Sequence, residues 1–364
     1  MMKSLLFLPD ISGFTEFIQN TEVEHSQHVI AELLDILIQS NIEGLELAEV
    51  EGDALFFFKE NEVPSLERLL AQAEQMYTAF YSHLELLKKN RVCPCNACMS
   101  APNLQLKIVA HCCDIQFINV QNKRKPFGKA VIQVHRLLKN SVDSDNYILI
   151  SDDLRKEIHL SENYQSKLFN FNSSSDFYDG EEIPYVYSEI NTKNLQLKPY
   201  SYAHKVNLGK PPTFTVDQDI QVSKEQLLEL ITNYKFRHEW TEGVEKFEYN
   251  EDEVTRLGTE HVCVVNGKHF NLVTVTKDVP AGVLVYGEYT ASPPIVKSIH
   301  TFYQLSSIGT HNTKLEIQLH LEPKNWINKL FIEFFVKKLF LKNSKKTIEA
   351  LKVYAEEYYA KEVV

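Results

Sequence analysis

An apolar run that stops abruptly at an aspartate is the feature that most constrains how this chain can fold. The run is Leu5–Pro9, it ends at Asp10, and a turn at Gly13 comes before a helical pattern begins. Such a run is typical of a buried strand that delivers a carboxylate to its end. The backbone N–H groups of Gly13, Phe14 and Thr15, where the helix starts, can face an anion.

A second carboxylate comes from a predicted hairpin. Leu45–Val50 leads into the turn Glu51-Gly52-Asp53, and Ala54–Phe58 leads out of it. If this hairpin packs beside the first strand, Asp10 and Asp53 converge. Two carboxylates beside a phosphate-sized nest of N–H groups can hold divalent metal ions and a triphosphate. In the alternative interpretation, Asp10 caps a helix and Asp53 is an ordinary turn residue.

Length and composition bound the possible functions. A chain of 364 residues with 44% hydrophobic residues predicts a large core and two domains. Its net charge of −11 argues against a nucleic-acid backbone or an anionic membrane surface as the main partner. No stretch reaches the length of a membrane span, and the N-terminus predicts no export signal. Six cysteines in such a chain indicate reduced thiols and a cytoplasmic location.

The first strand and the hairpin together resemble a known catalytic domain. The string Phe7-x-x-Asp10-Ile11-x-Gly13-Phe14-Thr15, followed by Gly52-Asp53, is similar to the start of class III nucleotidyl cyclases and to a related bacterial family of unknown function. The resemblance implies that Asp10, Asp53 and the carbonyl of Ile11 hold Mg²⁺ or Mn²⁺. It also implies a homodimer that acts on a purine nucleoside triphosphate, with Glu49 at the position of the purine-reading glutamate of guanylyl cyclases.

The resemblance continues to about residue 190, with departures. Arg136 matches the arginine that stabilises phosphate charge in the cyclases, but Ile132 stands where they have a ribose-orienting asparagine. The loop Asp179-Gly180-Glu181 carries acids where the cyclases often have a lysine, and acids repel a triphosphate. Two functions therefore stay open: an enzyme that cyclises a purine nucleotide, and an inactive cyclase-like fold that only dimerises or binds nucleotide or metal.

A cysteine-rich loop lies between a predicted helix and the next strand. Cys93, Cys95 and Cys98 place three thiols within six residues, and thiolates are preferred zinc ligands. A fourth ligand is expected from His111, Cys112, Cys113 or a second subunit. The alternative is a loop of reduced thiols without a metal.

Residues 1–190 are predicted to form an α+β domain of the cyclase-like, ferredoxin-type α/β sandwich class. Helical spacing of apolar residues predicts helices over Glu24–Ile42 and Ser65–Lys89. Alternation predicts a strand over Leu104–His111, with Ile115–Val120 as its return partner. Residues 191–212 are expected to be a linker because they contain Pro199, Gly209 and Pro211-Pro212 and show little hydrophobic periodicity.

Residues 213–364 follow a different order. We predict a strand, a short helix capped by Ser223, six antiparallel strands and a long helix from Trp326 to Tyr359 with one apolar stripe. This order resembles the START-like (SRPBCC, helix-grip) superfamily, which implies an apolar cavity for a hydrophobic small molecule. Trp240, Phe331 and Phe335 are the expected pocket residues, and the alternative for the phenylalanines is plain core packing.

Overall fold

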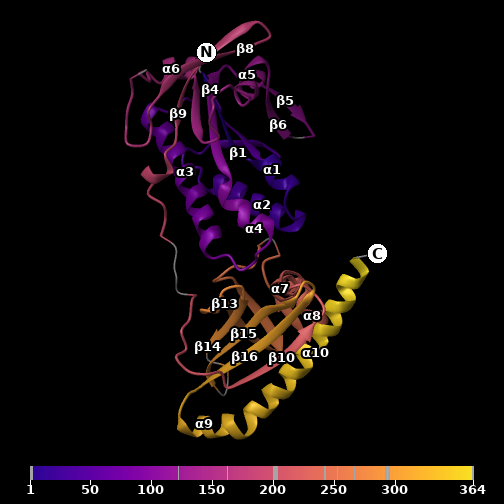
Figure 1. Ribbon diagram of the computed structural model, residues 1–364. Helices are drawn as coiled ribbons and strands as arrows, with labels where there is room; N and C mark the ends of the chain where they lie inside the picture. The colour runs from indigo at the N-terminus through magenta and orange to yellow at the C-terminus, as the bar shows by residue number, and fades with distance from the viewer. Residues whose placement is uncertain are drawn as a thin grey trace. The chain divides into compact units, whose positions relative to one another are not determined.

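The computed structural model describes residues 3–121, 123–161, 163–199, 204–241, 243–251, 253–265, 267–291, 293 and 296–362. The chain divides into two compact units, one of Met1–Lys88 with Asn96–Pro199 and one of Lys89–Cys95 with Tyr200–Val364 (Figure 1). Each unit has its own seven-stranded sheet. The class is mixed α+β.

The sheet of the first unit is built around its first strand. Its order is β2-β3-β1-β4-β7-β9-β8, and among these pairs only β4 and β7 run parallel. Asp10 is the one residue of β1 that is not fully buried. The strands are β1 Ser4–Ser12, β2 Glu46–Glu51, β3 Ala54–Lys59, β4 Gln105–Cys113, β7 Tyr147–Ser151, β8 Asn172–Tyr178 and β9 Glu181–Glu189.

One predicted strand pairing in this unit is wrong. We expected Ile115–Val120 to return along the strand at Leu104–His111. Instead β5 (Gln116–Val120) pairs with β6 (Lys123–Phe127) in a separate two-stranded sheet. Both sides of β4 are already paired, with β1 on one side and β7 on the other, so β5 cannot add to this strand.

Both helices predicted in the first unit are present, as Val23–Gln39 and Leu66–Lys89. Val134 and Leu137 of α5 pack in one core cluster with Leu6 and Leu8 of β1. The helices are α1 Phe14–Gln19, α2 Val23–Gln39, α3 Leu66–Lys89, α4 Asn96–Ser100, η1 Ala101–Asn103, α5 Lys129–Leu137, α6 Asp152–Glu157 and η2 Thr192–Asn194.

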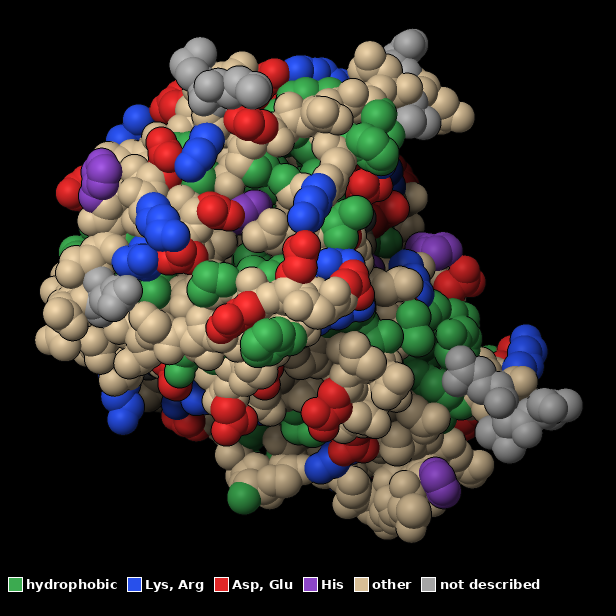
Figure 2. Space-filling view, turned by 90° about the horizontal axis from the view of Figure 1, so that it is seen from above, with side chains coloured by type: hydrophobic (Ala, Val, Ile, Leu, Met, Phe, Trp, Pro, Cys, Tyr) green, Lys and Arg blue, Asp and Glu red, His purple; other side chains and the backbone are tan. Residues whose placement is uncertain are grey.

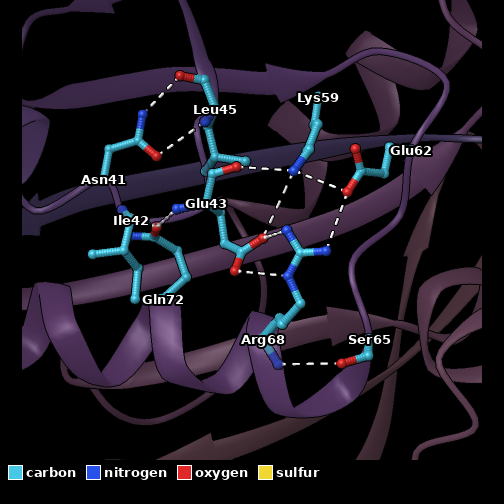
Figure 3. A network of polar contacts seen from close by, with 9 residues as sticks. All are labelled: Asn41, Ile42, Glu43, Leu45, Lys59, Glu62, Ser65, Arg68 and Gln72. Carbon is cyan, nitrogen blue, oxygen red and sulfur yellow. Dashed lines mark hydrogen bonds and ion pairs between the residues drawn. The ribbon is translucent and has the colours of Figure 1, made fainter.

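A buried glutamine fixes the connection from α2 to β2 (Figure 3). Gln72 of α3 has no exposed surface, and its side-chain oxygen accepts hydrogen bonds from the N–H groups of Ile42 and Glu43 at 2.8 and 3.0 Å. Its amide donates to the carbonyl of Ser40 at 3.0 Å. Because these groups would otherwise be unpaired, Gln72 determines where the chain enters β2, and so where the hairpin with Asp53 lies.

The second unit is an antiparallel sheet in the order β10-β16-β15-β14-β13-β12-β11. The predicted cap of its first helix is confirmed, because Ser223 and Gln226 form a reciprocal capping box at α7. Its strands are β10 Phe214–Ile220, β11 Lys246–Glu248, β12 Glu260–Val265, β13 Lys268–Val275, β14 Leu284–Ala291, β15 Val296–Gly309 and β16 Asn312–Pro323. Its short helices are α7 Lys224–Thr232, η3 Tyr234–Phe236 and α8 Arg237–Trp240.

The C-terminal helix is continuous but does not carry a single buried stripe. It comprises α9 (Trp326–Phe331), a π-helical turn η4 (Ile332–Val336) and α10 (Lys337–Glu362). Ile332, Val336, Ile348, Leu351 and Ala355 are buried. The large apolar residues of the first part form an exposed surface, here called the outer apolar face: Trp326, Ile327, Leu330, Phe331, Phe334, Phe335 and Leu339.

Helix geometry explains why the predicted stripe is wrong. Phe335 precedes Leu351 by sixteen residues, which at 3.6 residues per turn places it roughly 160° around the helix. Leu351 has no exposed surface, whereas Phe335 is 65% exposed. No helix of the described residues is both long and apolar enough to cross a membrane.

Candidate functional site

Two neighbouring strands bring Asp10 and Asp53 to the same edge of the first unit. In the antiparallel pairing of β1 with β3, Asp10 lies opposite Ala54, the residue that follows Asp53. The N–H of Ile11 donates to the carbonyl of Asp53 at 3.0 Å, which holds the hairpin turn against the end of β1. Gly52 makes the turn possible because it takes a left-handed conformation at φ 70°.

A lysine that the sequence analysis missed completes this site. Lys107 of β4 lies opposite Asp10 in the β1–β4 pairing, and its Nζ is 3.7 Å from Oδ2 of Asp10. Both side chains are largely buried, with 20% and 15% of their surface exposed. The strand predicted at Leu104–His111 contained Lys107, but the pattern within one strand does not reveal which residue lies opposite.

The charges at this edge are poorly balanced. Burial raises the pKa of Asp10 to about 6; Lys107 opposes this shift, while the charges of Asp53 and then Asp145 add to it. Burial also raises the pKa of Asp53, against a backbone hydrogen bond and Lys107. Carboxylate oxygens are the ligands that Mg²⁺ and Mn²⁺ prefer, so the donor set fits a divalent cation. Such an ion would relieve the repulsion between the two carboxylates.

The predicted anion-binding turn begins directly after β1. Gly13 has φ 86° and precedes α1, and the N–H of Phe17 donates to its carbonyl at 3.0 Å. The first N–H groups of a helix have no partner within the helix. Ser12 adds a buried hydroxyl that has no hydrogen-bond partner among the described residues.

A cavity of about 590 Å³ borders this turn. Its polar lining comes from α1, α4 and η1 and includes Glu16, Asn20, Asn96, Ser100 and Asn103. Phe17 and Leu104 contribute apolar surface. The cavity therefore offers uncharged donors and acceptors together with one carboxylate.

Arg136, the residue expected to meet phosphates, is engaged in an ion pair, and so is Lys129 on the same helix. Arg136 of α5 pairs with Asp179, and Lys129 pairs with Glu181 at 3.4 Å. Both acids belong to the Asp179-Gly180-Glu181 turn, so in this structure the turn neutralises the basic residues of α5. Ile132, at the position of the ribose-orienting asparagine, is 56% exposed.

Glu49, the expected purine reader, is also paired. Its carboxylate is 2.7 Å from Nζ of Lys125 on β6. On the face drawn in Figure 2, acidic and basic side chains lie intermixed. The side chains of the pairs formed by Glu49 and Arg136 are between 32% and 75% exposed, so solvent screens these pairs and they cost little to open.

The cysteine loop forms a compact group of metal-binding side chains. The ligand atoms of His25, Cys93, Cys95 and Cys98 all lie within 4.8 Å of one another. Sγ of Cys98 is 3.6 Å from Nδ1 of His25, and Sγ of Cys93 accepts the N–H of Cys95 at 3.4 Å. Three thiols and an imidazole can bind a metal ion.

The expected fourth ligands lie elsewhere. His111 and Cys112 are buried in β4, where Nδ1 of His111 lies 2.8 Å from the Ser151 hydroxyl. Burial lowers the pKa of His111 to about 4 and raises that of Cys112 and of Cys113 to about 12. His25 of α2 is instead the fourth side chain of the group. No spacing rule connects a histidine so far before the cysteine loop in the sequence to that loop.

The predicted pocket residues of the second unit are separated. Trp240 is buried, and its indole N–H donates to the carbonyl of Leu230 at 3.2 Å. Phe331 and Phe335 stack on each other with ring centroids 5.3 Å apart, but they lie on the outer apolar face. They point to solvent in this structure.

A buried polar cluster in this unit had no sequence signal. The guanidinium of Arg237 forms an ion pair with Glu288, and both side chains are almost fully buried. His261 lies 3.6 Å from Glu288, and burial together with Arg237 lowers its pKa to about 3. The hydroxyls of Tyr234 and Tyr286 are 3.0 Å apart, and Tyr286 donates to Glu288 at 2.9 Å. The cluster is thus a neutral histidine beside a buried ion pair, in which the Nε of Arg237 has no hydrogen-bond partner among the described residues.

Comparison with known sequences gives a match without a known activity. Residues 30–147 match DUF2652, a family of proteins of unknown function. An uncharacterised protein of Mycobacterium tuberculosis, Rv2561/Rv2562, is 34% identical over 123 residues, which make up 34% of this chain and 57% of that protein. The chain therefore spans somewhat over half the length of this relative.

Solved structures that are similar to the chain include cyclase domains. The guanylyl cyclase Cya2 is 14% identical with a TM-score of 0.39, and the match covers 52% of this chain and 91% of that one. The adenylyl cyclase CyaB from P. aeruginosa is 17% identical with a TM-score of 0.36, and the match covers 52% of this chain and 94% of that one.

Proposed function

We propose that the first unit binds a divalent cation through Asp10 and Asp53 and, beside it, the triphosphate of a purine nucleotide. One observation carries this proposal: Asp10 sits at the end of a buried central strand, where burial and the charge of Asp53 raise its pKa to about 6. One lysine compensates this carboxylate pair only in part. A divalent cation stabilises both carboxylates at once, and Mg²⁺ or Mn²⁺ suits an all-oxygen site.

The neighbouring residues have separate tasks in this proposal. Asp10, Asp53 and the main chain of Ile11 hold the cation, which supplies charge stabilisation at the phosphates and lowers the pKa of an attacking hydroxyl. The N–H groups of Gly13, Phe14 and Thr15 bind phosphate oxygens. Glu49 accepts a hydrogen bond from the purine after it leaves Lys125, and Arg136 neutralises phosphate charge after it leaves Asp179.

Cyclisation is the reaction that this set of residues serves. The ribose 3′-oxygen forms a bond to the α-phosphorus, the bond from that phosphorus to the bridging oxygen breaks, and pyrophosphate leaves. The hydroxyl proton passes to solvent. The purified chain incubated with ATP or GTP and Mn²⁺ should release a cyclic nucleotide and equal pyrophosphate, and Asp10→Asn should release neither. Asp143→Asn, an exposed carboxylate in a nearby loop, is the matched control.

The second candidate is a sensor that binds the nucleotide and leaves it intact. The ion pair Arg136–Asp179 favours it, because it occupies the arginine that would neutralise phosphate charge. Equilibrium dialysis with nucleotide and Mn²⁺ separates the candidates. Binding that Asp10→Asn abolishes, without any cyclic product, identifies the sensor. No metal-dependent binding in either assay would refute both.

For the cysteine loop we propose zinc. Tetrahedral sites with three thiolates and one imidazole are common structural zinc sites, and the ligand atoms here are already close. Protein purified without chelator should contain about one zinc per chain. His25→Ala and Cys98→Ser should lower this content, whereas Cys263→Ser, in β12, should not. Only trace zinc in the wild-type protein would leave the interpretation of reduced thiols without a metal.

For the second unit we propose a hydrophobic small-molecule ligand held near the buried Trp240. The sheet with a long helix across it supports this idea, as does the concentration of tyrosines and buried apolar residues between them. Thermal shift of the chain against fatty acids, isoprenoids and aromatic polyketides tests it. A saturating ligand should stabilise the unit by about 2–3 kcal/mol. If no compound raises the melting temperature, the proposal fails.

We also propose that the first unit forms a homodimer. Several large apolar residues of β2, β6 and α5 are exposed, among them Leu47, Val50, Phe127 and Ile132. A contact between two copies would cover them. Light scattering after size exclusion should give twice the chain mass, and Val50→Lys should shift it to the monomer. A monomeric wild-type protein would refute this proposal.

A further inference from the structure

The outer apolar face of the C-terminal helix is left largely uncovered by the described residues of the second unit. Seven large apolar side chains lie exposed within residues 326–339, and Trp326 is exposed by 72%. The same turns bury Ile332 and Val336 against the core, so the helix is anchored on one side and apolar on the other. A folded domain rarely leaves such a contiguous surface in water without a use for it.

The charges around this face are strongly biased. Residues 324–346 contain seven lysines and one glutamate, in a chain whose net charge is −11. Lys337 pairs with that glutamate, Glu333, at 2.8 Å. Lys338 is exposed and follows Phe334 by four residues, which places it on the same side of the helix. The net charge of the chain predicts no attraction to anionic membranes, but this segment is locally basic.

We propose that the outer apolar face docks onto the surface of a membrane that contains anionic lipids. A helix with Trp, Phe and Leu on one side and lysines beside them is typical of segments that lie in the membrane interface. The aromatic side chains enter the boundary between headgroups and acyl chains, where Trp is enriched. The long lysine side chains reach up to the lipid phosphates.

The same features disfavour other occupants. Two copies of this face brought together would place their lysines side by side, and like charges repel. A protein partner needs a matching shape, whereas a lipid surface adapts to a convex row of side chains. Charge complementarity therefore favours an anionic lipid surface over a second copy of the chain.

Tryptophan fluorescence tests the proposal with the full chain. The chain has two tryptophans, and Trp240 is buried whereas Trp326 is exposed. Vesicles of phosphatidylcholine with phosphatidylglycerol should shift the emission of Trp326 to the blue, and the chain should float with them. Vesicles of phosphatidylcholine alone should bind it much more weakly. In Trp326→Phe, the remaining emission of Trp240 should not shift.

Matched variants then separate docking from misfolding. Phe334→Ser with Phe335→Ser should weaken vesicle binding by roughly tenfold or more, because each phenylalanine loses its burial in lipid. Val353→Ser, an exposed apolar residue of α10 outside the face, should bind as the wild type does. Lys338→Glu with Lys342→Glu should weaken binding to the anionic vesicles only.

Two results would overturn the proposal. One is equal flotation of the wild type and the double serine variant, or no flotation at all. The other is a dimer that the wild type forms without lipid and that the double serine variant does not form, because the outer apolar face would then bind a second copy of the chain.

Discussion

Removing the charge of Asp10 should stabilise the metal-free first unit at neutral pH. The side chain is 15% exposed, and its pKa is raised from 3.8 to about 6. Well below pH 3.8 the carboxyl is protonated in both the folded and the unfolded chain, so it costs nothing. As the pH rises from about 4 to about 6, the carboxyl ionises in the unfolded chain before it ionises in the folded one, so stability is lost over this range and is constant above it.

The size of this loss follows from the shift. About two pKa units at 1.36 kcal/mol each give about 3 kcal/mol at pH 7.5. Asp10→Asn lacks this penalty and keeps an oxygen that can accept a hydrogen bond from Lys107. For a unit of this size, the gain corresponds to a melting temperature roughly 5–10 °C higher. Near pH 4 the gain should be only a small fraction of this, because the carboxyl is protonated in the folded chain and partly protonated in the unfolded one.

The two units allow an internal control in one urea titration. Both tryptophans lie in the second unit, so their fluorescence reports its unfolding, while far-ultraviolet circular dichroism follows both units. With EDTA at pH 7.5, Asp10→Asn should move only the transition that tryptophan does not report. With Mn²⁺ the wild type should gain stability and the variant should gain much less, because one ligand is missing.

Three results would refute this reasoning. If Asp10→Asn is no more stable than the wild type at pH 7.5 without metal, then burial and the charge of Asp53 do not destabilise the ionised carboxylate of Asp10. An equal gain at pH 4 would show that the effect is not ionisation. Equal stabilisation of both proteins by Mn²⁺ would show that Asp10 is not a ligand.

Three further tests use substitutions in other parts of the structure. Gln72→Met should destabilise the first unit by about 2–4 kcal/mol in urea unfolding, because buried N–H groups lose their acceptor. Gln75 is half-buried on the same helix, and Gln75→Met should cost less than about 1 kcal/mol. Asp179→Asn should release Arg136 and so raise the affinity of the chain for a nucleoside triphosphate severalfold, as measured by titration with a fluorescent nucleotide in the presence of Mn²⁺. An unchanged affinity would show that the Arg136–Asp179 ion pair does not limit nucleotide binding. Leu351→Ala should cost about 2–5 kcal/mol, whereas Phe335→Ala should cost under about 0.5 kcal/mol, and the reverse order would mean that the helix is rotated.

Local patterns in the sequence predicted much of the fold. The apolar run before Asp10 is the central strand, Gly52-Asp53 is the hairpin turn, and Ser223 caps its helix. These features depend on residues within a few positions of one another: alternation, turn chemistry and side-chain caps. The sequence therefore determined them without knowledge of the rest of the chain. Even the exposed position of Phe335, on the side of the helix opposite Leu351, follows from counting residues along the helix.

The tertiary structure decided which side chains meet. Lys107 reaches Asp10 only because β4 pairs with β1, His25 reaches Cys98 from a helix 73 positions earlier, and Arg136 is neutralised by Asp179 from another hairpin. No periodicity encodes such contacts. They depend on strand order, register and the closure of long loops, which the packing of the whole core selects. The chemistry of the candidate site is therefore a property of the folded chain, although each of its carboxylates could be found in the sequence.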